Sequence, residues 1–313
     1  MPISNEVPIA NDASALLRSE DPGSVYGDKS HNIRGAQVVD PNNPVWGLGG
    51  ALLIWIASIL VQAIIPVFFL VPFAMHRGLD PGSPEFVKGT LELAMSDRTA
   101  ILLQVIAILP THLVTLGLIW ALVTRFGKRP FLQSFGWGWS TRLRLWQCLG
   151  LGVCLFGAAT TLAALLGAEK PTQLEQLITS SFGARYMIAF LAVFTAPFIE
   201  EFVYRGVIYS ALQRTIGMWG AVVFVAVLFT SIHVPQYWPN IGVISAVALL
   251  SIVLSLARAY SGKLLPCIII HMSFNAVQAL ILVAGPFFQR SAPTPEPVVP
   301  TASMILTLFH FLF

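Results

Sequence analysis

The sequence contains few charged residues for its length. Its 313 residues include 18 Lys and Arg and 15 Asp and Glu, so charged side chains make up 11% of the chain. A soluble protein has about 25%. Apolar residues reach 56% and the mean hydropathy is +0.75. A soluble globule of this size could not cover its surface with so few polar groups. A protein in a bilayer does not need a polar surface where it contacts lipid. The composition therefore predicts a polytopic membrane protein and argues against soluble enzymes and, with a net charge of only +3, against nucleic-acid binders.

Cysteine is also scarce, and the first 45 residues do not have the pattern of a signal peptide. Cys148, Cys154 and Cys267 lie in or beside apolar stretches, which excludes a disulfide scaffold and gives no metal or redox signature. Residues 1–45 are polar and lack a basic start followed by an apolar stretch and a cleavage site. We expect this segment to be a flexible polar tail and not a signal peptide.

Long apolar segments follow the tail. A helix needs about 20 residues to cross a hydrocarbon layer of about 30 Å. The segments that reach or approach this length are 46–75, 99–124, 145–168, 186–209, 217–233, 241–257 and 264–285. They predict an all-α transmembrane helix bundle over 46–285. Residues 286–313 hold a proline-rich stretch and a last apolar segment, 301–313, which is either a short eighth span or an interfacial helix. The expected total is seven to eight spans.

Basic residues indicate which side of the membrane each connection faces. The connection 125–144 has five basic residues and no acidic one, which favours the cytoplasmic side. Alternation of the spans then places the N-terminus in the cytoplasm. With this orientation, the inner segments hold 12 of the 18 basic residues.

Two adjacent carboxylates and an arginine interrupt the fourth apolar segment. Ionisable groups at membrane depth cost at least about 2.5 kcal/mol each, so they persist mainly where they are paired or face a polar cavity. Residues four apart share a helix face, which pairs Glu201 with Arg205. Glu200 lies on the stripe of Ala192 and Ala196, without a cation. Because desolvation favours the protonated form of a lone carboxylate, Glu200 is the candidate general base.

Two later apolar segments add histidines. His233 ends the fifth apolar segment, and His271 and Asn275 share one face of the seventh. Each motif alone is more typical of a hydrogen-bonded packing residue, and His112 is interpreted in that way. The joint occurrence of Glu200 with these three residues instead indicates a catalytic group. The Glu201 and Arg205 pair is interpreted as support for the base.

A hairpin would bring the acid and the first histidine together. A turn near 215–217 lies midway between Glu200 and His233, so an antiparallel pair of helices places both about 20 Å from the turn. The prolines at 235 and 239 predict irregular backbone over 234–240.

The three motifs, in this order, resemble a known family. Glu-Glu-x-x-x-Arg at 200–205, Phe-x-x-x-His at 229–233 and His-x-x-x-Asn at 271–275 are similar to the motifs of the CPBP (Abi) family of intramembrane proteases, which includes the type II CAAX prenyl endopeptidases. The resemblance covers about 124–285. It implies an endopeptidase that hydrolyses peptide bonds of membrane-associated substrates, including prenylated CAAX-type tails.

The resemblance also implies a role for each motif residue. Glu200 would activate water, and His233 would help to hold that water. His271 and Asn275 would stabilise the oxyanion of the tetrahedral intermediate. The implied partners are the lipid bilayer and a peptide or protein substrate, with or without a lipid group, and no nucleic acid.

The sequence leaves alternatives for both the cofactor and the class of function. Glu200, His233 and His271 are a ligand set that zinc accepts, and the family is often labelled metalloprotease. The compact His-Glu-x-x-His arrangement is absent, so we expect no cofactor, with zinc as the alternative. A proton-coupled transporter could use the same buried residues as a relay, although no inverted repeat is evident. A non-catalytic membrane scaffold is the third possibility.

Overall fold

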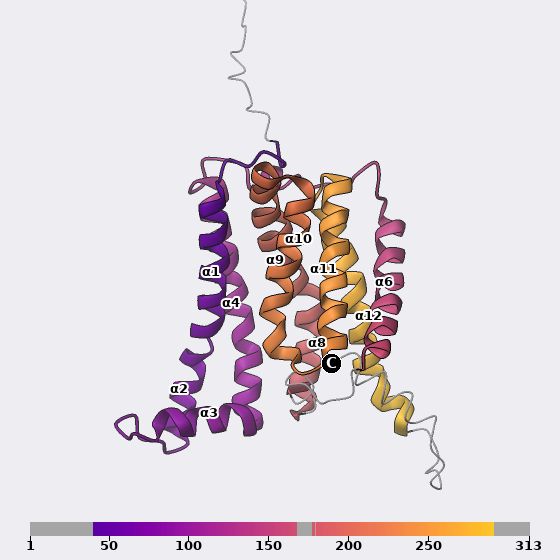
Figure 1. The fold of residues 1–313 in the computed structure, drawn as a ribbon. Helices are drawn as coiled ribbons and strands as arrows, with labels where there is room; N and C mark the ends of the chain where they lie inside the picture. The colour runs from indigo at the N-terminus through magenta and orange to yellow at the C-terminus, as the bar shows by residue number, and fades with distance from the viewer. Residues whose placement is uncertain (1–39, 168–176, 179, 291–313) are drawn as a thin grey trace, which may run out of the picture. The chain divides into compact units, whose positions relative to one another are not determined.

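The computed structural model describes residues 40–167, 177–178 and 180–290, with side chains to 285. Within these residues the chain forms helices and connecting turns, with no strand. The predicted fold class, a polytopic helix bundle, is confirmed (Figure 1). The expected tail up to residue 39 and the last apolar segment, 301–313, lie outside the described residues.

The helices follow the apolar segments closely. In chain order they are α1 (Leu48–Ile64), α2 (Val67–His76), α3 (Phe86–Ser96), α4 (Arg98–Thr124), α5 (Phe131–Ser134) and α6 (Leu145–Leu165). The second half contains α8 (Phe182–Phe190), η1 (Leu191–Thr195), α9 (Ala196–Glu201), η2 (Phe202–Ile208), α10 (Tyr209–Tyr237), α11 (Ile241–Ser261) and α12 (Leu265–Arg290). The two η elements are π-helical. The short helices α3 and α5 were not expected from the sequence.

Six helical stretches of the described chain are long and apolar enough to cross a membrane. One of them, 182–237, is 56 residues long and turns back at Gly217, whose φ of 77° and ψ of 174° are not helical. Glycine suits this position because it adopts positive φ without a steric penalty. The turn predicted near 215–217 is therefore confirmed. The stretch 182–237 forms two antiparallel helical segments, one on each side of this turn.

Apolar side chains cover the outside of the bundle as well as its interior. Leu53, Phe68, Leu113 and Trp146 are each more than 60% exposed although they lie on or beside long apolar helices. Such a surface would be unfavourable in water and suits contact with acyl chains. The chain is thus a multi-pass integral membrane protein.

Close helix packing positions the second half of the bundle. α6 packs against both α11 and α12, and α10 packs against α11. Gly152 of α6 lies so near α12 that a Cβ atom there would be 2.6 Å from Cβ of Ser273 and 2.7 Å from the Ile270 carbonyl oxygen. Gly242 of α11 approaches the Ala163 carbonyl oxygen in the same way, at 2.5 Å. Small residues let the backbones meet where no hydrophobic effect drives helix association.

Candidate active site

The element that carries the two acids is irregular on both sides. The six-residue α9 contains Glu200 and Glu201 and lies between the π-helices η1 and η2. Pro197, near the start of α9, has no amide hydrogen to bond the carbonyl of Val193. The wider turns of η1 accommodate this missing bond. Short π-helical segments occur frequently at functional sites.

Glu201 and Arg205 form the predicted pair. The Arg205 Nη1 atom donates to Glu201 Oε1 at 2.9 Å, and both side chains are fully buried. Arg205 Nη2 also donates to the carbonyl and the hydroxyl of Ser251, at 2.9 and 2.7 Å. Its guanidinium lies 4.9 Å from the ring centroid of Phe229. The arginine therefore connects the acid-bearing element to α10 and α11.

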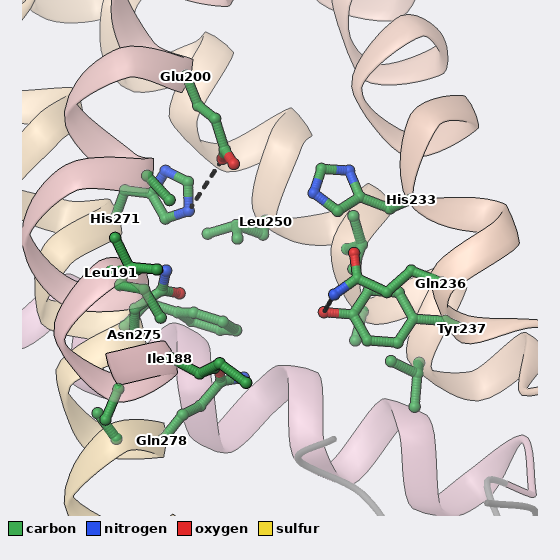
Figure 2. Close-up of a pocket in the computed structure, with 18 of the residues that line it drawn as sticks. Ile188, Leu191, Glu200, His233, Gln236, Tyr237, Leu250, His271, Asn275 and Gln278 are labelled. Atoms are coloured by element: carbon green, nitrogen blue, oxygen red, sulfur yellow. Dashed lines mark hydrogen bonds and ion pairs between the residues drawn. The ribbon is translucent and has the colours of Figure 1, made fainter. Parts of the chain in front are cut away.

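His271 lies between the two carboxylates. Its Nδ1 atom is 3.0 Å from Glu201 Oε1, and its Nε2 atom is 3.8 Å from Glu200 Oε2. A carboxylate only accepts hydrogen bonds, so Nδ1 carries the hydrogen of that contact. Glu201 therefore orients the ring and directs Nε2 toward Glu200 (Figure 2). The sequence did not indicate this bond between Glu201 and His271.

His233 faces Glu200 from α10. Its Nδ1 atom lies 2.7 Å from the Phe229 carbonyl oxygen, one turn earlier in the same helix. A carbonyl only accepts, so the neutral ring carries its hydrogen on Nδ1 and leaves Nε2 as an acceptor. The prediction of irregular backbone after this residue was wrong over 234–237, because α10 stays helical through Pro235 to Tyr237. The turn comes only at Trp238 and Pro239.

Asn275 lies one turn beyond His271 on α12. Its Nδ2 atom donates to the Ala192 carbonyl oxygen at 2.7 Å, which attaches the amide to η1. A side-chain amide has two N–H hydrogens, so one remains for another acceptor.

His112, interpreted as a packing residue, contacts Thr195 Oγ1 at 3.0 Å through Nδ1.

One pocket of about 360 Å³ brings these groups together. Glu200, His233, His271 and Asn275 all line it, and the predicted stripe of Ala192 and Ala196 lines it beside Glu200. Glu200 is 25% exposed, whereas Glu201 is fully buried. Glu200 is thus the carboxylate that faces the cavity. Further polar lining residues, which sequence reasoning missed, are Gln62, Thr160, Gln236, Tyr237 and Gln278.

The fit of these residues to a metal ion can be tested from their positions. In the part of the chain that the structure describes, no group of three or more His, Cys, Asp or Glu side chains is close enough to hold one. The alternative zinc ligands Glu200, His233 and His271 therefore lack the mutual approach that a zinc site requires. One nitrogen of each histidine is already engaged, by Phe229 or by Glu201.

The fold and the pocket define a multi-pass helical membrane protein with an acid and two histidines facing an internal cavity. Residues 182–277 match the model of the type II CAAX prenyl endopeptidase Rce1-like family. This match contains all three motifs and confirms the family resemblance, over a shorter range than the expected 124–285. The matched residues make up less than a third of the chain, and within them the chain is similar to this family of membrane proteases. No curated protein and no solved structure matches the chain.

Proposed function

We propose that this protein is an intramembrane endopeptidase in which Glu200 is the general base. The observation that carries the proposal is the pocket inside the helix bundle, which Glu200, His233, His271 and Asn275 line together. Hydrolysis of a peptide bond needs a base for water and donors aimed at the developing negative charge. The pocket offers both kinds of group, and the family match supports a protease.

In the proposed first step, a water molecule lies between Glu200 and His233. Glu200 accepts one of its protons as the oxygen attacks the carbonyl carbon, and it returns this proton to the leaving nitrogen when the C–N bond breaks. The Nε2 atom of His233 accepts a hydrogen bond from the second O–H of the water. This bond orients a lone pair of the water oxygen toward the substrate. The bond between Nδ1 and the Phe229 carbonyl supports this role, because it leaves Nε2 as an acceptor.

His271 and Asn275 would stabilise the tetrahedral oxyanion. His271 lies between the carboxylates of Glu200 and Glu201, and the proposed role requires a hydrogen on each of its nitrogens. Its Nε2 atom can then donate to the oxyanion, while Nδ1 stays bonded to Glu201. The free N–H of Asn275 is a second donor. Glu201 and Arg205 act by holding the imidazole and do not touch the substrate.

The substrate class we propose is a membrane-associated protein, with prenylated CAAX-type tails as the first candidates. The name of the matching family and the position of the pocket among membrane-spanning helices support this choice. Paired reporters with and without a prenyl group, in the same lipid vesicles, test the lipid requirement. Equal cleavage of both would contradict it.

Substitution of the base tests the mechanism. Glu200→Gln keeps the shape of the side chain but cannot accept the proton, so we expect cleavage to fall by at least about 10²-fold. His233→Ala should reduce cleavage similarly. Both variants should unfold at the temperature of the wild type, measured in detergent. The base assignment is falsified if Glu200→Gln cleaves at the wild-type rate.

We further propose that the reaction proceeds without a metal ion. What supports this is the spacing of Glu200, His233 and His271, which do not form a ligand cluster. We expect elemental analysis of active protein to give far less than one zinc per chain, and chelators to leave activity unchanged. Stoichiometric zinc, together with activity that chelation removes and zinc restores, would show that the metal is required.

A further inference from the structure

Two helices that face each other across the pocket carry neutral hydrogen-bonding side chains beyond their histidines. On α10, Gln236 and Tyr237 follow His233 by three and four residues, so all three share one helix face. On α12, Gln278 follows His271 by seven residues, again on one face. All of these side chains line the pocket. None of the three neutral residues takes part in the proposed chemistry.

The histidines and the neutral side chains lie at successive positions along α10 and α12. α10 beyond Gly217 and α12 run in the same direction, with His233 and His271 near Glu200 and the neutral residues farther from it (Figure 2). At 1.5 Å per residue, Gln236 and Tyr237 lie about 5 to 6 Å beyond His233, and Gln278 lies about 10 Å beyond His271. An extended peptide advances about 3.3 Å per residue. These positions therefore correspond to the second and third residues of a bound chain, counted from the reacting carbonyl.

The chemistry of these side chains matches a peptide main chain. A glutamine amide both donates and accepts, as does a peptide unit. The Tyr237 hydroxyl accepts from Gln236 Nε2 at 3.5 Å, which leaves the hydroxyl hydrogen available for a ligand. Apolar Ile188, Leu191 and Leu250 line the pocket around them. Apart from Glu200, the lining residues that the structure describes include no Lys, Arg, Asp or Glu, so the ligand best suited to this part is uncharged.

We propose that Gln236, Tyr237 and Gln278 form a subsite that binds the main chain of an extended apolar peptide segment on one side of the scissile bond. This inference rests on the proposed endopeptidase function. The glutamines and the tyrosine hold the peptide units, and the apolar walls accept the side chains. The subsite thereby positions the scissile carbonyl beside Glu200, with the carbonyl oxygen directed toward His271.

Binding measured in the absence of turnover tests the subsite. In the Glu200→Gln background, the dissociation constant of a fluorescent peptide is measured in vesicles, first with Gln278 and then with Gln278→Leu. We expect Gln278→Leu to weaken binding about 5- to 10-fold, the effect of one or two neutral hydrogen bonds. Gln133→Leu is the matched control, because Gln133 is exposed and does not line the pocket. It should leave the dissociation constant unchanged.

A change in the peptide backbone separates direct contact from a general structural effect. Replacing one peptide amide by an ester removes its N–H donor. We expect an ester at the third residue from the scissile bond to weaken binding, and to have no such effect once Gln278 is leucine. Equal ester effects in both backgrounds at every position, or equal losses from Gln133→Leu and Gln278→Leu, would overturn the subsite.

The two proposals can fail separately. If the wild type cleaves no reporter but the ester effect depends on Gln278, the endopeptidase function is wrong and the subsite remains. If cleavage depends on Glu200 but the ester effect is the same in both backgrounds, the function remains and the subsite is wrong. A peptide that does not bind to the Glu200→Gln protein at all also overturns the subsite.

Discussion

At the scale of single residues, two neighbouring glutamates have different environments. Glu201 is buried and accepts hydrogen bonds from both Arg205 and His271 through Oε1. Glu200, the next residue in the sequence, faces the pocket and has His271 Nε2 at 3.8 Å. One carboxylate is thus committed to holding the site together, while the other remains available to solvent in the cavity. A rotation of about 100° between adjacent helical residues is enough to separate them.

Removal of the arginine tests the supporting role of the pair. Arg205→Ala leaves Glu201 buried without its cation, which typically costs about 3 to 5 kcal/mol of folding free energy. We expect a lower yield of folded protein and a lower unfolding temperature in detergent. Glu200→Gln, which changes a partly exposed carboxylate, should unfold as the wild type does. If Arg205→Ala is as stable as the wild type, the pair does not support the fold.

At the scale of elements, the interface between α6 and α12 positions the wall of the pocket that α12 forms. α12 carries His271, Asn275 and Gln278, and its Ser273 hydroxyl donates to the Leu149 carbonyl of α6 at 2.9 Å. The contact at Gly152 allows the two backbones to come this close. A shift of α12 would therefore move the proposed oxyanion donors away from Glu200. Geometry at the site thus depends on packing outside it.

Two glycines of one helix provide a matched test of this interface. A methyl group at Gly152 would meet Ser273 and the Ile270 carbonyl, whereas one at Gly150 would meet nothing within 4 Å. We expect Gly152→Ala to destabilise the protein by about 1 to 3 kcal/mol, because the added atom overpacks the contact, and to lower cleavage. Gly150→Ala should preserve both. Thermal unfolding and reporter cleavage measure the effects, and equal behaviour of the two variants would contradict the expectation.

At the scale of the whole molecule, the bundle divides the connections between two membrane faces. The basic connection 125–144 follows the end of α4, whereas the connection between α2 and α3 comes before the start of α4. The two connections therefore lie at opposite ends of α4. The charge pattern favours the cytoplasm for 125–144. We propose on this basis that the N-terminus is cytoplasmic as well.

Labelling of single cysteines tests the orientation. Thr141 and Glu85 are exposed residues in the two connections. In intact cells, a membrane-impermeant maleimide should label Glu85→Cys and not Thr141→Cys, with the native Cys154 replaced by serine in both. After permeabilisation both should react, which is the control for accessibility. The opposite labelling pattern would reverse the orientation.

The sequence by itself determined the helical membrane class, the turn near 215–217 and the pairing of Glu201 with Arg205. These follow from local properties, namely hydropathy over about 20 residues, the length of chain between two polar positions and the four-residue helical period. The spacing also predicted that Glu200 and His233 would lie at similar heights, and the joint occurrence of these residues with His271 and Asn275 indicated one catalytic group.

Only the tertiary structure decided the contacts between distant segments. His271 bonds to Glu201, and Arg205 donates to Ser251. Gln236 and Gln278 line the same pocket. Each of these contacts connects residues far apart in the chain. The π-helices around α9 and the helical path through Pro235 were also not evident from the sequence. Such features depend on how helices rotate and pack against one another, and hydropathy and local spacing contain no information on that packing.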